Sequence, residues 1–221
     1  VMHSLGFDRE GLVLHLDAGS FKGKLNNGDA ITIPWDDLSG QGNPADNQVG
    51  DPKWLESALN GQPVVDFDGN DILWTTKDFE PDLAHYSIFS VARYSGGGNN
   101  RVISSRGRNW FFGFHGNTIR RFHSDGYAWN QGGADHNWHI HIGEVNDKDQ
   151  ANFWLDGTQL ARNSNGLHNS NYKPRNINLG GYNDNNERSK CQVAELLLFN
   201  RVLDDAQRQY IELYLKSKYA L

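Results

Sequence analysis

The sequence predicts an all-β sandwich that ends in one helix, and two observations carry this prediction. Short runs in which apolar and polar residues alternate recur along the 221 residues, with turn-forming residues between them. Helical signals gather in one segment, from Asp205 onward, where Asp204 is a suitable N-cap and Gln207 completes a capping box. An apolar stripe at helical spacing follows, made of Tyr210, Ile211, Leu213, Tyr214 and Leu215.

The strand pattern occurs in seven segments. Successive side chains of a strand point to opposite faces, so residues two apart share a face. The hairpin segment contains Asp156-Gly157, a dipeptide that suits the tight primed turns. In residues 138–142, Ile140 and Ile142 form an apolar face, and we expect His139 and His141 on an exposed or groove-facing side. The predicted strands are residues 12–16, 64–67, 86–93, 110–115, 138–142, the hairpin 153–161, and 192–199.

Composition and charge exclude several classes of partner. Lys and Arg number 21 against 27 Asp and Glu, so the net charge is -6, and no basic run exists. This argues against nucleic acid and anionic membrane surfaces. The sequence has no segment with the length and apolar character of a membrane-spanning helix, so we expect no membrane insertion. Aromatic residues reach 12% although hydrophobic residues make up only 37%. That combination leaves aromatic surface to spare for a ligand.

The organisation of the chain favours one domain over residues 1–221. No segment repeats at a fixed period and no linker divides the sequence. We expect loops at residues 20–54, 95–101 and 126–137, which are rich in Gly, Asn and Asp. We interpret the start at Val1 as a boundary within a longer protein that carries other domains. The expected location is secreted or at the cell surface, of a bacterium.

Short motifs follow one another along nearly the whole chain. They are GLVLHLDA at 11–18, WDDLSGQGN at 35–43, NGQPVVDFDG at 60–69, WH at 138–139, LDG at 155–157, AELLLFNR at 194–201 and KSKYAL at 216–221. In this order the chain resembles the laminin-G-like members of the concanavalin-A-like lectin/glucanase superfamily. The resemblance implies a jelly roll of two antiparallel sheets, one of them concave. It implies much less about activity, because this fold hosts lectins, adhesion modules, lyases and hydrolases.

No catalytic residue is predicted. Glycoside hydrolysis needs two carboxylates beside one bond, and the glucanases that the chain resembles carry a Glu-x-Asp-x-(x)-Glu strand that is absent from this sequence. We interpret Glu144 with Asp147 and Asp149 as a hydrated turn, and Glu195 as a lone acid that hydrogen-bonds locally. The alginate-lyase relatives use Arg-x-Glu-x-Arg and Gln-(Ile/Val)-His strands, which are also missing. Only residues 138–141 echo the second pattern, and they keep a lyase as the enzymatic alternative.

A metal site is left unassigned. Asp68-Gly69-Asn70-Asp71 could donate oxygen atoms to Ca²⁺, and the resemblance implies that the family often carries a structural calcium ion. The spacing differs from an EF-hand loop, and a plain β-turn explains the same residues. We therefore expect no required cofactor, with a structural Ca²⁺ as the alternative.

Carbohydrate binding needs flat aromatic faces for the sugar rings and polar side chains for their hydroxyl groups, and residues 106–129 hold this mixture. Trp129 is expected in a surface loop, while Trp110 has a core position beside Phe112 and Phe114 as its alternative. Arg108, Arg121 and His123 add positive charge to an acidic protein, which favours an anionic glycan. The predicted carbohydrate-binding residues are Arg108, Trp110, Arg121, His123, Tyr127, Trp129 and, on another loop, Tyr182.

Three functions fit these observations. The first is a non-catalytic carbohydrate-binding or adhesion module whose partner is a polysaccharide or other glycan, with an anionic one, uronate-containing or sulfated, favoured over a neutral one. The second is a lyase that acts on a uronic-acid polymer. The third is a domain for adhesion between proteins.

Overall fold

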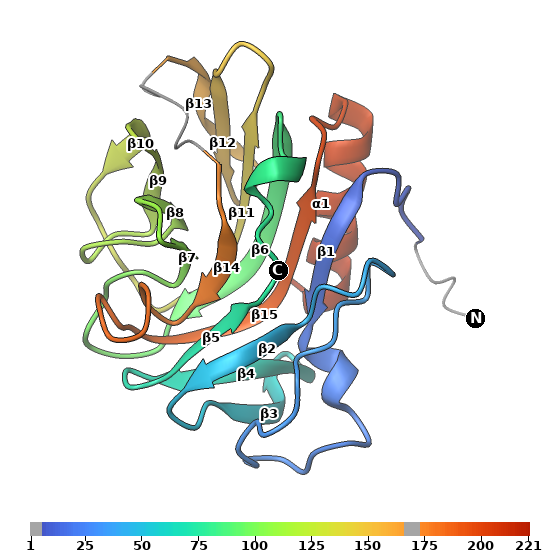
Figure 1. The fold of residues 1–221 in the computed structure, drawn as a ribbon, viewed down its shortest axis with the longest axis vertical. Coiled ribbons are helices and arrows are strands. Elements are labelled where there is room, and N and C mark those ends of the chain that lie inside the picture. Colours follow the sequence, from blue (N-terminus) through green and yellow to red (C-terminus); the bar gives the residue numbers. More distant parts are fainter. Residues whose placement is uncertain (1–5, 166–172) are drawn as a thin grey trace.

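The computed structural model describes residues 6–165 and 173–221 and is a sandwich of two antiparallel sheets (Figure 1). The larger sheet has eight strands. They are β1 (Leu12–Asp17), β3 (Lys53–Leu59), β4 (Gln62–Asp68), β6 (Tyr86–Tyr94), β11 (His139–Val145), β12 (Ala151–Leu155), β13 (Thr158–Ser164) and β15 (Lys190–Phe199). Their order is β13-β12-β11-β6-β15-β4-β3, and β1 also pairs with β15.

The smaller sheet has seven strands in the order β10-β9-β8-β7-β14-β5-β2, and its neighbours are also antiparallel. Short 3-10 helices lie at Ala18–Phe21 and Glu80–Asp82. The strands of this sheet are β2 (Ala45–Val49), β5 (Ile72–Thr75), β7 (Ile103–Arg106), β8 (Trp110–Gly113), β9 (Arg120–Ser124), β10 (Tyr127–Gln131) and β14 (Asn176–Leu179).

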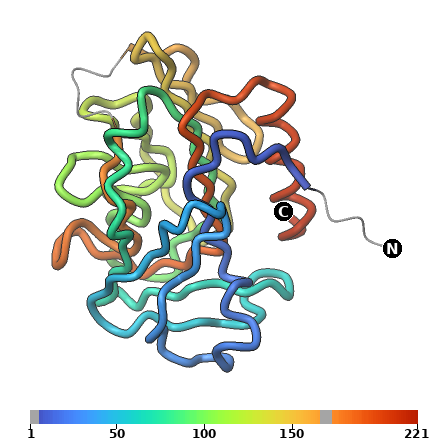
Figure 2. The backbone as a smooth tube through the Cα atoms, turned by 45° about the vertical axis from the view of Figure 1, so that its right-hand side comes forward, coloured from blue at the N-terminus to red at the C-terminus, as the bar shows by residue number. Residues whose placement is uncertain are grey.

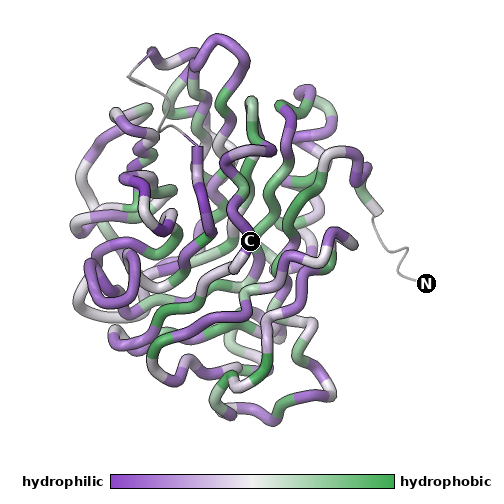
Figure 3. Tube along the Cα trace, viewed as in Figure 1, coloured by the Kyte–Doolittle hydropathy of each residue, from purple (hydrophilic) through white to green (hydrophobic). Residues whose placement is uncertain are grey.

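The main core fills the space between the two sheets. Trp110, Phe112 and Phe122 of the smaller sheet are fully buried in it, together with Ile88 and Leu196 of the larger sheet. Hydrophobic residues, green in Figure 3, concentrate along the strands, while many of the connecting loops are purple. The alternating strands therefore bury one face of each sheet, as the period of two requires.

The C-terminal helix α1 (Asp205–Tyr219) covers the outer face of the larger sheet. Ile211 and Leu215 of α1 pack in a second buried cluster with Ile140, Ile142 and Leu197 of that sheet. Figure 2 shows the red helix on the opposite side of the molecule from the yellow-green strands β8 to β10. The outer face of the smaller sheet is consequently the one that α1 leaves uncovered.

The predicted fold class is confirmed as a jelly-roll sandwich of two antiparallel sheets with one C-terminal α-helix in the described residues. Asp204 Oδ1 accepts a hydrogen bond from the Gln207 N–H at 2.8 Å, so the predicted capping box is present. Asp156 and Gly157 have φ values of 49° and 85°, the left-handed values of the expected primed turn.

Two of the predicted loops contain strands, so those predictions were wrong. Strand β2 lies within residues 20–54, and β10 within residues 126–137. Each pairs with one strand of the smaller sheet and lies at its edge, and Ala45 of β2 also exchanges backbone hydrogen bonds with Trp35. Backbone hydrogen bonds to these partners hold them extended, although their sequences, ADNQV and YAWNQ, are polar. Tertiary pairing has overridden a weak local preference.

Among the described residues, no helix is both long enough and apolar enough to cross a lipid bilayer.

Candidate functional site

One residue from each strand of the smaller sheet contributes to a row that crosses this sheet. Except at the edge strand β2, a residue directly before or after each of them, such as Leu73, Ile103 or Phe112, lies in the main core. Because side chains alternate along a strand, the row lies on the outer face of the sheet. Neighbouring strands lie about 4.8 Å apart, so the six steps between the seven strands give the row a length of roughly 29 Å. In the order of pairing, this outer row is Asn47, Trp74, Asn178, Ser104, Phe111, His123 and Tyr127.

A cluster of rings gathers around Phe111 at one end of the outer row. The imidazole of His115 stacks on the Phe111 ring with centroids 4.4 Å apart, and that of His123 stacks at 5.0 Å. Tyr127 meets Phe111 edge-on at 6.1 Å. The Arg101 guanidinium lies 4.7 Å from the Phe111 centroid. Phe111 itself is buried, so the rings that surround it form the surface here. We call these five residues with Tyr182 the Phe111 cluster.

Tyr182 joins the cluster through Arg101. The Arg101 guanidinium lies 4.2 Å from the Tyr182 ring centroid and also forms an ion pair with Glu187. Its Nη2 donates to Asn109 Oδ1 at 2.8 Å. Contacts with two rings and a carboxylate fix Arg101 in one position, so the cluster is rigid before any ligand arrives.

Arg121 adds a positive charge beside the cluster, and its hydrogen-bond acceptors do not neutralise this charge. Its Nε donates to Asn130 Oδ1 at 2.6 Å, and its Nη1 donates to the carbonyl oxygen of His115 at 3.0 Å. Both acceptors are neutral groups. The guanidinium is half-buried, and its charge remains available to an anionic group on a ligand.

Both histidines of the cluster favour the uncharged state. Burial lowers the pKa of His115, and the neighbouring Glu187 opposes this effect only in part. Burial also lowers the pKa of His123. His123 Nδ1 lies 2.8 Å from the carbonyl oxygen of Asn109 and must donate its proton there, because a carbonyl only accepts. The neutral His123 ring therefore presents Nε2 as a hydrogen-bond acceptor.

The middle of the outer row is covered. Ser104 Oγ donates to the carbonyl oxygen of Gly181 at 2.6 Å, and Asn178 Nδ2 donates to the same oxygen at 3.0 Å. Both side chains are fully buried under the loop that carries Tyr182. Beyond this loop, the Arg106 guanidinium lies 4.3 Å from the half-buried Trp74 ring. The loop thus divides the row into the Phe111 cluster and a smaller Trp74–Arg106 pair.

Four of the predicted carbohydrate-binding residues meet in this place. Arg121, His123, Tyr127 and Tyr182 all lie in or directly beside the Phe111 cluster. Sequence reasoning missed the other participants. The alternation in residues 110–115 already placed Phe111 and His115 on the face opposite Trp110, and this was the signal that could have found them. The missed residues are Arg101, Phe111, His115 and Glu187.

Two predicted residues pack in or against the main core. Trp110 is fully buried, and its Nε1 donates to the Tyr86 hydroxyl at 2.9 Å, so the core alternative holds for this side chain. Trp129 lies in strand β10 and packs against the main core, not in a surface loop. Its indole N–H is buried without a hydrogen-bond partner in the described residues. The Trp110 ring is therefore not free to stack on a sugar, whereas the Trp129 ring is half-buried and keeps some exposed surface.

Arg108 lies outside the cluster. Its Nε and Nη2 each donate to a carboxylate oxygen of Glu80 at 3.0 Å. This bidentate ion pair fastens the loop before β8 to the 3-10 helix at Glu80–Asp82. The charge of Arg108 is thereby neutralised within the protein.

The expectation that His139 and His141 face solvent or a groove was wrong, since both rings are buried. His141 lies between the sheets, stacked on Phe153 with 5.9 Å between centroids, and burial lowers its pKa to about 4. His139 donates from Nδ1 to Asp156 at 2.7 Å and from Nε2 to Asp135 at 2.8 Å. Burial disfavours its charged form, but these two carboxylates raise the pKa of His139 overall.

The prediction that Glu144 belongs to a hydrated turn was also wrong. It lies in β11 and is only 4% exposed, because its strand position faces α1. Burial raises the pKa of its carboxyl group to about 7.

Asp71 of the turn at 68–71 is buried and hydrogen-bonded to the backbone. Its Oδ1 accepts from the Asp51 N–H at 2.8 Å and its Oδ2 from the Asp68 N–H at 2.9 Å. Burial raises the pKa of this carboxyl group. Both oxygens thus anchor the chain around a tight turn.

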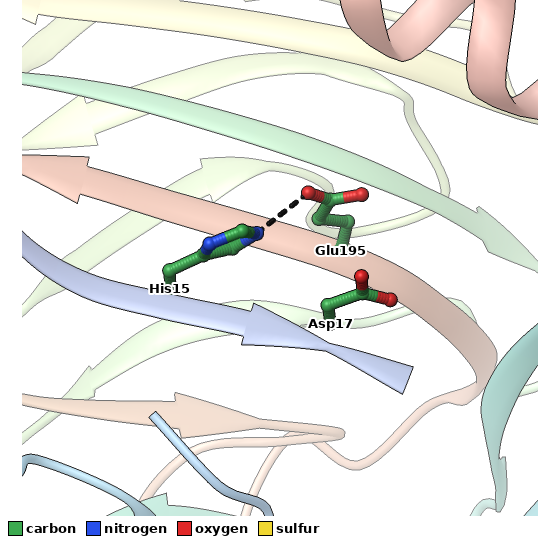
Figure 4. Close-up of side chains that lie close together, drawn as sticks. All are labelled: His15, Asp17 and Glu195. Carbon is green, nitrogen blue, oxygen red and sulfur yellow. Dashed lines mark hydrogen bonds and ion pairs between the residues drawn. The ribbon is translucent and has the colours of Figure 1, made fainter. Parts of the chain in front are cut away.

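A potential group of metal ligands is occupied by an ammonium. In residues 6–165 and 173–221, only His15, Asp17 and Glu195 bring three ligand atoms within 4.8 Å of one another (Figure 4). The Lys218 Nζ lies 2.6 Å from Asp17 Oδ2 and 2.6 Å from Glu195 Oε2. This side chain supplies the positive charge that a cation would bring, and it ties α1 to β1 and β15. Glu195 is hydrogen-bonded as expected, but to residues distant in the sequence, including His15 through its Nε2 at 2.7 Å.

Comparisons with known proteins find this fold in several solved structures. No protein-family model and no curated protein matches the sequence. A Trypanosoma rangeli sialidase mutant that displays trans-sialidase activity matches with a TM-score of 0.59 and 14% identity, over 95% of this chain and 33% of that one. The chain therefore spans about a third of the length of the sialidases that it matches.

Two shorter proteins are also similar. Domain 4 of AbnA, a GH43 extracellular arabinanase from Geobacillus stearothermophilus solved with arabinotriose, has a TM-score of 0.58 and 16% identity, over 90% of this chain and 97% of that domain. The binding domain of Paraclostridial Mosquitocidal Protein 1 has a TM-score of 0.59 and 12% identity, over 93% of this chain and 52% of that one. At these identities the likeness shows the shared fold, a jelly-roll β-sandwich.

Proposed function

We propose that this chain is a non-catalytic carbohydrate-binding module of the laminin-G-like type that recognises a polysaccharide through the Phe111 cluster. The observation that carries the proposal is the stack of rings around Phe111, in which Arg101 is held between two aromatic side chains. Exposed rings offer flat apolar faces for sugar C–H groups. The polar atoms beside them can bind hydroxyl groups.

Tyr127 is the most accessible ring of the cluster, with 40% of its surface exposed. It lies on the edge strand β10 and contacts both Phe111 and His123 edge-on. Its backbone is fixed by pairing with His123. A ring held in this way loses little conformational freedom when a sugar covers it.

An anionic polysaccharide, such as a uronate-containing or sulfated polymer, is the proposed ligand class. The support is Arg121, whose hydrogen bonds go to the neutral acceptors Asn130 and His115. Arg101, by contrast, is paired with Glu187. Because the protein has a net charge of -6, a local positive charge is needed to attract an anionic ligand.

The structural neighbours support the general function. The arabinanase domain was solved with arabinotriose, and cell entry of botulinum neurotoxin type C, a further structural neighbour, depends on interaction with two ganglioside molecules. This chain spans 97% of the arabinanase domain and 52% of the neurotoxin chain. We extend the proposal to a secreted or cell-surface location and to a module of a larger protein.

The testing experiment compares Tyr127→Ala with Tyr210→Ala on an array of neutral, uronate and sulfated glycans. Tyr210 is 38% exposed and lies on α1, so it matches Tyr127 in type and exposure. We expect Tyr127→Ala alone to weaken binding, by roughly 1–3 kcal/mol for the loss of a covered aromatic ring. Equal binding by wild type and both variants would remove the Phe111 cluster as the site. A wild type that binds no glycan would leave adhesion between proteins as the better function.

A further inference from the structure

A polar seam runs between α1 and the last strands of the larger sheet, on the opposite side of the sandwich from the Phe111 cluster. It contains a cavity of about 240 Å³ and a second one of about 340 Å³. Both cavities are lined by Trp154 and Arg208, so they meet at these two side chains. The smaller cavity is further lined by Glu144, Asn152, Gln159, Arg162, Asn163 and Asp205.

Glu144 presents an unused acceptor to the smaller cavity. Its side chain points toward α1, as do those of Ile140 and Ile142, four and two residues earlier on β11. Glu144 Oε2 accepts a long hydrogen bond from Asn152 Nδ2 at 3.4 Å. Glu144 Oε1 is buried and has no hydrogen-bond partner in the described residues. A buried acceptor without a partner is uncommon in proteins and calls for a group that satisfies it.

Arg208 presents unused donors to the same place. Its guanidinium lies 4.3 Å from the Trp154 ring centroid, and its residue exposure is only 7%. Its contacts to Asp205 and Glu212 are long, 3.4 Å and 3.9 Å. Its Nε is buried without a partner among the residues that the structure describes. The seam therefore offers an acceptor and a donor that a single small molecule can satisfy together.

The balance of charges selects a neutral ligand. Three carboxylates line the two cavities, from Glu144, Asp205 and Glu212, and three cations face them, from Arg162, Arg208 and Lys216. An ion of either sign would meet like charges as well as opposite ones. A polyhydroxylated molecule can donate to a carboxylate and accept from a guanidinium at the same time. We propose that this seam binds one neutral sugar residue, with a hydroxyl group that donates to Glu144 Oε1 and another that accepts from Arg208.

The acid at the centre of the seam gives this binding a characteristic pH dependence. Burial raises the pKa of Glu144 to about 7, while Arg208 lowers and Asp205 raises it to smaller extents. The other charged groups lining the smaller cavity are Arg162 from β13 and Arg208 and Asp205 from α1, and none of its described lining residues is a histidine. The ionised carboxylate accepts more strongly than the protonated acid. Affinity should therefore fall as the pH drops through about 7.

The experiment is an NMR titration of the whole chain with glucose, galactose and arabinose, each tested separately. We expect at least one sugar to shift the backbone amides of Asn152 and Arg162 saturably. Between about pH 8 and about pH 6 the ionised fraction of a group with pKa near 7 falls from about 90% to about 10%, so affinity should fall several-fold. Glu144→Gln keeps the shape of the side chain but cannot ionise, and it should weaken binding at the higher pH and abolish the pH dependence. Glu56→Gln, an exposed acid on β3 of the same sheet, is the matched control and should behave like the wild type.

The seam site does not depend on the Phe111 cluster, and the same titration keeps the two apart. Tyr127→Ala should leave the shifts at Asn152 and Arg162 unchanged, whatever it does to polysaccharide binding. The proposal is overturned if none of the three sugars shifts these amides saturably. It is also overturned if Glu144→Gln binds with the wild-type affinity and pH dependence, because Glu144 then makes no contact with the ligand.

Discussion

The Lys218 ammonium lies 2.6 Å from Glu195 Oε2 and holds the end of α1 against the centre of the larger sheet. Glu195 is fully buried, and it also accepts from the hydroxyl groups of Tyr214 and Tyr219 at 3.0 Å and 2.7 Å. Burial opposes ionisation of Glu195, but hydrogen bonding and charge from His15 and Lys218 lower its pKa overall. A carboxylate buried this deeply can stay ionised only because its partners replace the water that it has lost.

Replacing Lys218 with methionine should destabilise the protein by about 3–5 kcal/mol, because it leaves the buried carboxylate of Glu195 and the half-buried carboxylate of Asp17 without their cation. Urea unfolding at neutral pH measures the change. Lys190→Met is the control, since Lys190 is an exposed lysine on the same strand as Glu195 and should change stability by less than about 0.5 kcal/mol. Similar midpoints for the two variants would mean that the network contributes little.

The network also illustrates what the sequence could and could not predict. The lone acid in an apolar strand predicts local hydrogen bonds for Glu195, and its carboxylate is hydrogen-bonded, but to residues distant in the sequence. Its partners His15 and Lys218 are 180 and 23 residues away, so only the pairing of β1 with β15 and the docking of α1 bring them together. Capping and turn signals, by contrast, act within a few residues, and Asp204 and Asp156-Gly157 were predictable for that reason.

Only part of the candidate site could be predicted from the sequence, because some of its residues are distant from one another along the chain. Composition drew attention to residues 106–129, and Arg121, His123 and Tyr127 do lie together. Arg101 and Glu187 reach the cluster from other parts of the chain, and no local pattern indicates such a meeting. The polar neighbours Asn130, Gln131 and Gly132 predict a loop for Trp129. The edge strand β10 turns its ring toward the core instead.

The pH dependence of stability should report on His139. Its pKa is raised in the folded protein above the ordinary value of 6.5, because Asp156 and Asp135 outweigh burial. The stability that this pair of contacts contributes is fully present below pH 6.5 and is lost as the pH rises through the folded-state pKa. His139→Gln should therefore lose more stability below pH 6.5 than at a pH above the folded-state pKa of His139.

Thermal or urea unfolding of this variant across the range from acidic to mildly alkaline pH provides the measurement. His136→Gln changes an exposed histidine of the same segment and should follow the wild-type curve. A parallel offset of the His139→Gln curve at every pH would show that the ring contributes packing alone, without a proton-linked effect.

Trp110 and Tyr127, both predicted to bind carbohydrate, should differ in how much their replacement destabilises the protein. Trp110→Ala should destabilise the fold by about 3–5 kcal/mol, because it leaves a cavity in the packed core and removes one of the partners of the Tyr86 hydroxyl. Tyr127→Ala should change stability by less than about 1 kcal/mol, because its ring is 40% exposed. Urea unfolding of both variants tests this, and equal losses of stability would contradict the division into core and surface.

Salt should reveal whether the polysaccharide is anionic. The exposed charges of a protein and ligand are screened within about 10 Å at 0.1 M salt, so an anionic ligand should bind more weakly as salt is added. Arg121 lies at the Phe111 cluster with hydrogen bonds to neutral acceptors only, so Arg121→Gln should weaken binding at low salt and flatten the salt dependence.

The measurement is calorimetric titration with the glycan that binds best on the array. Arg9→Gln, which removes an exposed arginine near the N-terminus, is the charge-matched control and should retain the wild-type salt dependence. An affinity that does not respond to salt in the wild type would point to a neutral polysaccharide, because Arg121 would then act as a hydrogen-bond donor without long-range attraction.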